Sequence, residues 1–194
     1  MGLETFIELN RTFVKYSQDD AQDASGDSIE HSDALGLKVI DDLSWDDLFE
    51  KRRVVILAPA GAGKTSEIRK AAIKLRSKGK SAFFLRIEHL SDNLDGAFEE
   101  GDVSEFEEWL KGNDEGWIFL DSIDEARLKS PYCFEEAVRK IATTLKPKKQ
   151  SVHIIMTSRI EAWRRKTDLD LCNKQFEYIL PQEKIAQIGD RTIS

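Results

Sequence analysis

The sequence predicts an α/β fold in which a parallel β-sheet is covered by helices on both faces. Three observations lead to this prediction. Short runs that are apolar at every position, such as Val54–Leu57 and Trp117–Leu120, alternate along the chain with segments of helical periodicity. A strand that is apolar throughout is typical of parallel sheets, which are buried on both faces. The chain of 194 residues is also long enough for one domain with a substantial core.

The composition limits the partners and the compartment that we expect. The chain has a net charge of -7, but its first 50 residues hold 13 acidic and 3 basic side chains, so residues 51–194 carry +3. This balance argues against a nucleic-acid-binding surface over the whole molecule, and it leaves a local basic face open. Because no run of 18 apolar residues and no leader segment occurs, we expect a cytoplasmic protein without a membrane partner.

The cysteines and histidines do not indicate a metal site. Cys133 and Cys172 lack the C-x-x-C spacing of zinc ligands, which predicts two reduced, buried thiols. His153 lies inside an apolar run, so we expect it to be structural or exposed and not catalytic.

Three regions are expected: an N-terminal segment at 1–43, one domain at 44–181 and a C-terminal tail at 182–194. Residues 3–16 show no clear period, so helix and strand both stay open. Residues 17–34 are rich in Asp, Ser, Gln and Gly, which predicts a mobile acidic loop, with an acidic interaction tail as the alternative. Ser44 and Asp47 form a capping pair, which predicts a short helix before the first strand.

The remaining segments alternate between helix and strand patterns. The spacing of Ile68, Ala71, Ala72 and Leu75 predicts an amphipathic helix that ends at Gly79. The other expected elements are strands at Ser81–Ile87, Trp117–Leu120, Val152–Met156 and Phe176–Leu180, a loop at Glu88–Asp102, a helix from a cap at Ser104 to Gly112, a helix from a cap at Ser130 to Pro147, and a short helix at Ile160–Arg165.

The first strand leads into a loop of small residues, A-P-A-G-A-G-K-T, and then into the first long helix. Small residues let backbone N–H groups point at phosphate oxygens, and a helix N-terminus adds partial positive charge. Lys64 would then reach the β- and γ-phosphates, and the Thr65 hydroxyl would hold Mg²⁺. Ala58 replaces the first glycine of the usual pattern, and we still expect the loop to form because alanine is small. The residues predicted to bind the nucleotide are Ala60, Gly61, Ala62, Gly63, Lys64, Thr65 and Ser66.

A cluster of carboxylates follows the third strand. Ligand sites of open α/β sheets lie at the carboxyl ends of the strands, so Asp121 should lie beside the phosphate loop. We expect it to hold Mg²⁺ together with Thr65, either directly or through another ligand of the metal. Asp124 and Glu125 follow within one helical turn, and either one is a candidate to orient an attacking water. The sequence leaves this choice open, with Glu125 slightly favoured.

The fourth strand ends in I-I-M-T-S-R, which places Arg159 at the same edge of the sheet. A guanidinium at this point is a candidate sensor of the γ-phosphate because it can make two hydrogen bonds at once. The alternative is a surface arginine that pairs with a carboxylate such as Glu161.

With these motifs, the chain resembles the STAND class of signal-transducing P-loop NTPases, and within it the NACHT family. The similarity lies in residues 58–65, 118–125 and 154–159, and the resemblance spans residues 50–181. It implies a three-layer P-loop NTPase fold of the ASCE type, with a parallel five-stranded sheet in the order 5-1-4-3-2. It also implies ATP and Mg²⁺ as cofactors and Arg159 as sensor 1.

The resemblance implies a regulatory module of a bacterial signalling or antiviral defence protein that binds ATP and hydrolyses it slowly in isolation. The helical and winged-helix domains that complete a STAND switch do not follow, so we expect a fragment or a minimal homologue that is monomeric as given and forms oligomers only in a full-length form. An AAA+-type ring ATPase or loader acting on nucleic acid and a non-hydrolysing nucleotide-binding scaffold are the alternatives. The choice between ATP and GTP stays open.

Overall fold

The computed structural model describes residues 12–13 and 43–178, and its contacts divide the chain into two units, residues 1–50 and 51–194. In the first unit, Phe13 and Leu43 form an isolated antiparallel bridge. Helix α1 (Trp45–Phe49) follows a capping box in which the Ser44 hydroxyl accepts from the Asp47 N–H and the Asp47 carboxylate accepts from the Ser44 N–H. The predicted short helix is therefore confirmed. The predictions for residues 17–34 and 182–194 lie outside the described residues. The same holds for the prediction for residues 3–16, of which only residues 12–13 are described.

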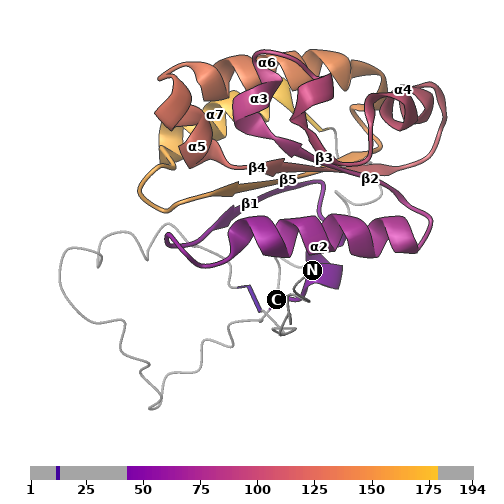
Figure 1. Cartoon of the computed structure of the whole chain (residues 1–194), viewed down its shortest axis with the longest axis horizontal. Coiled ribbons are helices and arrows are strands. Elements are labelled where there is room, and N and C mark those ends of the chain that lie inside the picture. The colour runs from indigo at the N-terminus through magenta and orange to yellow at the C-terminus, as the bar shows by residue number, and fades with distance from the viewer. Residues whose placement is uncertain (1–11, 14–42, 179–194) are drawn as a thin grey trace, which may run out of the picture. The chain divides into compact units, whose positions relative to one another are not determined.

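The second unit is an α/β structure around a five-stranded, mostly parallel sheet (Figure 1). The strands lie in the order β1-β5-β4-β2-β3. Strands β1, β5, β4 and β2 run parallel to one another, whereas β3 is antiparallel to β2. Strand bounds are β1 (Arg53–Leu57), β2 (Ser81–Arg86), β3 (Phe98–Glu100), β4 (Gly116–Asp121) and β5 (Val152–Ser158).

The expected sheet order 5-1-4-3-2 is wrong, because both edges of the sheet differ from the prediction. The segment Phe176–Leu180 is predicted to form a strand, but Phe176 caps a helix and residues 177–178 are irregular, while residues 179–180 lie outside the described residues. At the other edge β3 lies within the predicted loop Glu88–Asp102. This strand has only three residues, two of them glutamates, so it carries no periodic signal. The four parallel strands β1, β5, β4 and β2 lie next to one another in the order that the prediction gave for the corresponding segments.

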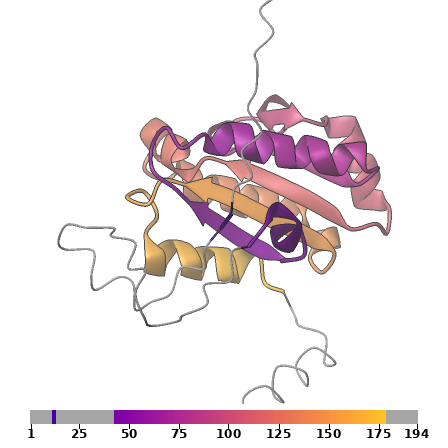
Figure 2. The same cartoon turned by 90° about the horizontal axis from the view of Figure 1, so that it is seen from below.

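Helices cover both faces of the sheet. Helix α2 (Lys64–Ser77) lies along one face of the sheet, and the helices from α3 to α7 lie on the opposite face (Figures 1 and 2). Within the described part of the chain, no helix is long and apolar enough to cross a membrane. The remaining helices are α3 (Ile87–Leu90), α4 (Val103–Lys111), α5 (Ile123–Lys129), α6 (Cys133–Thr144) and α7 (Arg165–Gln175), with 3₁₀ turns η2 (Asp95–Ala97) and η3 (Lys146–Lys148).

Three predicted helix boundaries need correction. Helix α4 is capped by Asp102, whose carboxylate accepts from the Glu105 N–H at 2.9 Å, so Ser104 lies inside the helix. Ser130 ends α5, and α6 begins after Tyr132. Residues 160–162 form a turn, and a helix starts only at Arg165. For α4 the sequence offers two capping residues two positions apart, Asp102 and Ser104, whereas α6 and α7 begin without a side-chain cap, so no local signal marks their first residues.

The main apolar cluster lies between the sheet and helices α3 to α7. It includes the rings of Phe83, Phe106 and Trp109, whose centroids lie 5.1–5.6 Å apart. Both cysteines are buried free thiols, as predicted. His153 is structural, one of the two expected outcomes: its ring stacks on Trp117 at 4.7 Å.

Candidate functional site

The loop between β1 and α2 has the backbone geometry that its glycines allow. Gly61 and Gly63 have φ values of 73° and 76°, in the left-handed region that residues with a Cβ rarely adopt. Gly63 is also the N-cap of α2, so the helix begins directly behind the loop. The Ala58 N–H donates to the Ser158 carbonyl at 3.2 Å, which extends the pairing of β1 and β5 into the loop. Residues 60–66, predicted to bind nucleotide, thus form one continuous loop and first helical turn.

Lys64 folds back over this loop. Its Nζ donates to the Ala58 carbonyl at 3.3 Å and to the Pro59 carbonyl at 3.1 Å. Neutral carbonyl groups are weak partners for an ammonium group compared with phosphate oxygens, which carry full charge. The ammonium is therefore placed at the loop, where an anionic ligand would provide a stronger partner.

Asp121 is the centre of the hydrogen-bond network at the carboxyl ends of the strands. Its side chain is fully buried, and its Oδ2 accepts from the Thr65 hydroxyl at 2.6 Å. Its Oδ1 accepts from the hydroxyl of Thr157, near the end of β5. The two residues predicted to bind the metal, Thr65 and Asp121, are thus in direct contact although 56 positions separate them in the sequence.

The chemistry of this pair fits Mg²⁺. A hydroxyl and a carboxylate are oxygen ligands, and Mg²⁺ is commonly held by one or two protein groups plus substrate phosphates and water. Among the described residues, no group of three or more His, Cys, Asp or Glu side chains could hold a metal ion by itself. Thr65 and Asp121 supply two oxygen ligands, a number that suits a metal bound together with a phosphate.

Asp124 and Arg159 form a two-point contact. The Arg159 N–H donates to Asp124 Oδ1 at 3.1 Å, and the Arg159 Nε lies 2.7 Å from Asp124 Oδ2. Asp124 is buried, so its charge is balanced by this arginine. The carboxylate that pairs with Arg159 is thus Asp124, whereas the sequence suggested Glu161.

Glu125 points to the other side of the site. Its carboxylate accepts from Nη2 of Arg86, the last residue of β2. Arg86 lies opposite Asp121 in the parallel register, and its Nη1 is 3.4 Å from Asp121 Oδ2. The same guanidinium donates from Nε to Glu88 at 2.8 Å. One arginine therefore contacts three carboxylates.

The pKa values of this cluster reflect burial and neighbouring charge. Burial raises the pKa of the Glu125 carboxyl; Arg86 opposes this shift, and the negative charges of Glu88, Asp121 and Asp124 add to it. For Arg86, burial acts to lower the pKa, but the hydrogen bond and charge of Glu88, together with Glu125 and Asp121, outweigh it and the pKa is raised. Arg86 therefore stays charged at any pH of interest.

Sequence reasoning missed Arg86 and Thr157. Both are polar residues at or near the carboxyl end of an apolar strand, which is the same signal that identifies Asp121. That signal becomes specific only when β2 and β5 are known to flank β4. A search for polar residues at the ends of all four parallel strands would have found both.

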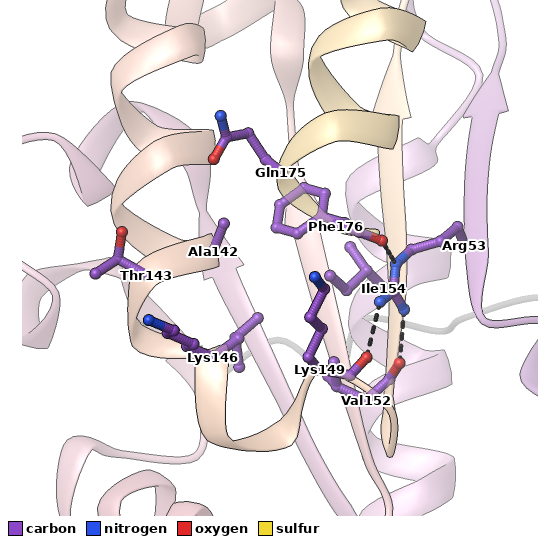
Figure 3. A pocket seen from close by; sticks show the side chains of 10 residues that line it. Arg53, Ala142, Thr143, Lys146, Lys149, Val152, Ile154, Gln175 and Phe176 are labelled. Carbon is purple, nitrogen blue, oxygen red and sulfur yellow. Dashed lines mark hydrogen bonds between the residues drawn. The ribbon is translucent and has the colours of Figure 1, made fainter. Parts of the chain in front are cut away.

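A cavity of about 290 Å³ lies at the opposite end of the sheet and does not involve these residues (Figure 3). Arg53, the first residue of β1, lines it with donors directed at the carbonyl groups of Phe176, Val152 and Lys149. Burial and the nearby Arg52 lower the pKa of Arg53 to about 10. Because these hydrogen bonds already engage Arg53, we assign it a structural role in joining β1, β5 and the end of α7. The cavity is not the predicted nucleotide site.

Comparisons of the chain with protein families and with curated proteins found no relative: no family model matches the chain, and no curated protein matches it.

Proposed function

We propose that the chain binds ATP with Mg²⁺ at the loop between β1 and α2 and hydrolyses it slowly, as a regulatory NTPase module of the NACHT-like STAND type. One observation carries the proposal. The hydroxyl of Thr65, the second residue of α2, donates to the fully buried carboxylate of Asp121 at the end of β4, with β5 between β1 and β4. A glycine loop formed by chance would not require a buried carboxylate at this point.

Each residue around the loop has a role in this proposal. The backbone N–H groups of the loop and the Lys64 ammonium bind the phosphates. Thr65 and Asp121 would hold Mg²⁺, which neutralises charge on the phosphate oxygens. Glu125 orients the attacking water, and Arg159 senses the γ-phosphate.

The exposure of the site supports slow turnover. Pro59, Ala60 and Gly61 are exposed, and the Arg159 side chain is 44% exposed. Catalysis of phosphoryl transfer depends on positioned charges, and these act weakly when water surrounds them. We therefore expect nucleotide binding to be measurable more readily than hydrolysis.

Replacing Lys64 with alanine is expected to weaken Mg-ATP binding by about 10–100-fold, because charge-assisted hydrogen bonds worth about 1.5–3 kcal/mol are lost. Isothermal calorimetry at fixed Mg²⁺ measures this change. Lys74→Ala is the matched control, because Lys74 lies on the exposed part of the same helix near its far end. Equal affinities for wild type and Lys64→Ala would contradict the proposed site, and competition with GTP and ADP would define the ligand class.

A non-hydrolysing nucleotide-binding scaffold is the second candidate. The observation that favours it is that both candidates to orient the attacking water, Asp124 and Glu125, already form ion pairs with arginines. Single-turnover assays with excess protein separate the two proposals, because the scaffold would release ATP unchanged.

A further inference from the structure

Arg86 occupies a position that the proposed reaction does not explain. Its guanidinium lies among three acidic side chains: Nε binds Glu88 at 2.8 Å, Nη1 is 3.4 Å from Asp121, and Nη2 binds Glu125. These carboxylates come from two different segments, the first turn of α3 and the end of β4 with α5. The side chain of Arg86, at the end of β2, bridges these two segments.

The burial of Asp121 explains why such a bridge is required. The Asp121 side chain is fully buried, and an ionised carboxylate is costly to bury without a partner of opposite charge. The hydroxyl groups of Thr65 and Thr157 supply hydrogen bonds but no charge. The ion pair that the structure gives Asp121 is with Arg86.

A cation that arrives with the nucleotide would face the same carboxylate. Mg²⁺ held near Thr65 and Asp121 carries two positive charges and would lie close to the guanidinium of Arg86, whose side chain is 20% exposed. Two cations near one carboxylate repel each other, and this repulsion is screened little by solvent. Binding of the metal and the contact between Arg86 and Asp121 therefore oppose each other.

We infer that Arg86 is a positioning residue that acts as the counter-ion of Asp121 and Glu125 in the nucleotide-free site and competes with Mg²⁺ for this carboxylate pair. The inference rests on the proposed function, since it concerns the regulation of the same site. It makes Arg86 the residue that sets how much Mg²⁺ the site requires. Binding of the metal would also affect Glu125, because Arg86 binds both Asp121 and Glu125. If Mg²⁺ displaces Arg86 from Asp121, the contact of Arg86 with Glu125 changes as well.

The test uses the full chain and ADP, so that the readout does not depend on hydrolysis. The quantity measured by calorimetry is the Mg²⁺ concentration at which ADP binding reaches half of its Mg²⁺-dependent increase in affinity. Neutralising Arg86 in Arg86→Met is expected to lower this concentration by about 5–50-fold, a range typical of coupling between two binding events. Arg86→Lys retains the charge and is expected to stay within about threefold of wild type.

Two further variants separate this effect from its alternatives. Arg69→Met removes an arginine whose described ion pairs are with Glu99 and Glu100 and do not include Asp121, and it is expected to leave the Mg²⁺ requirement unchanged. Arg86→Gln is also neutral but keeps hydrogen-bonding groups. If circular dichroism shows that Arg86→Met does not fold, the Mg²⁺ requirement of Arg86→Gln is measured in its place.

The outcomes distinguish the inference from the proposed function. An unchanged or higher Mg²⁺ requirement in a folded, neutral Arg86 variant would overturn the inference and leave the nucleotide site standing. An equal shift in Arg69→Met would also overturn it, because the effect would then reflect net charge alone. If wild type binds no nucleotide at any Mg²⁺ concentration, the proposed function fails and the inference fails with it.

Discussion

Replacing Glu125 with glutamine is expected to slow single-turnover ATP hydrolysis by about 10²–10⁴-fold and to leave Mg-ATP binding within a few-fold of wild type. The carboxylate of Glu125 is 39% exposed and stands at the first turn of α5, four residues after Asp121. It can therefore accept a hydrogen bond from a water molecule, which glutamine orients poorly and cannot deprotonate. Rapid-quench assays with protein in excess measure the chemical step alone.

Asp124→Asn is the matched comparison for this experiment. Both oxygens of Asp124 are engaged by Arg159, and the side chain is buried, so we expect a smaller loss of hydrolysis than in Glu125→Gln. A larger loss in Asp124→Asn would move the water-orienting role to that residue. No loss in either variant would contradict the catalytic interpretation of both carboxylates and favour the scaffold.

Replacing Phe119 with alanine is expected to reduce the free energy of unfolding by about 3–5 kcal/mol, as for other buried phenylalanines. Phe119 is fully buried at the middle of β4, the strand that carries Asp121. Its neighbours Ile118 and Leu120 belong to the cluster under α3 to α7, so the alternation of a strand directs Phe119 to the face that α2 covers. Urea denaturation followed by circular dichroism measures the change.

Leu128→Ala serves as the control for Phe119→Ala. Leu128 is 80% exposed, so truncating it removes little buried apolar surface, and we expect a change within about 0.5 kcal/mol. Similar losses in both variants would mean that β4 is not the central buried strand that the structure describes.

The parallel strands were predictable because their signal is local. Each has at least three apolar residues in succession, and each is followed by small or polar residues. The loop before α2 is equally local, since its glycines and Lys64 are neighbours in the sequence. The contact between Thr65 and Asp121 follows from these elements once the carboxyl ends of parallel strands are taken to share one edge.

The elements that sequence reasoning missed depend on distant partners. Helix α7 has a buried aspartate on its inner face: Asp168 pairs with Arg127 on α5 at 2.6 Å, which interrupts the apolar pattern of the helix. Strand β3 forms because β2 offers an edge for pairing, and its own three residues give no strand signal. For the same reason the residues next to Arg86 in the sequence do not indicate its role, since its partner Glu125 lies 39 positions away.

The two arginines at the site hold α5 from opposite sides. Arg86, at the end of β2, binds Glu125, and Arg159, just after β5, binds Asp124, while β4 runs between these two strands. A helix of seven residues is too short to be rigid by itself. The same helix is anchored to the core by Ile123 and Ala126, which are fully buried. The two adjacent acidic side chains of its first turn are therefore each bound to a different strand end, so a substitution of one arginine is expected to release one carboxylate and leave the other in place.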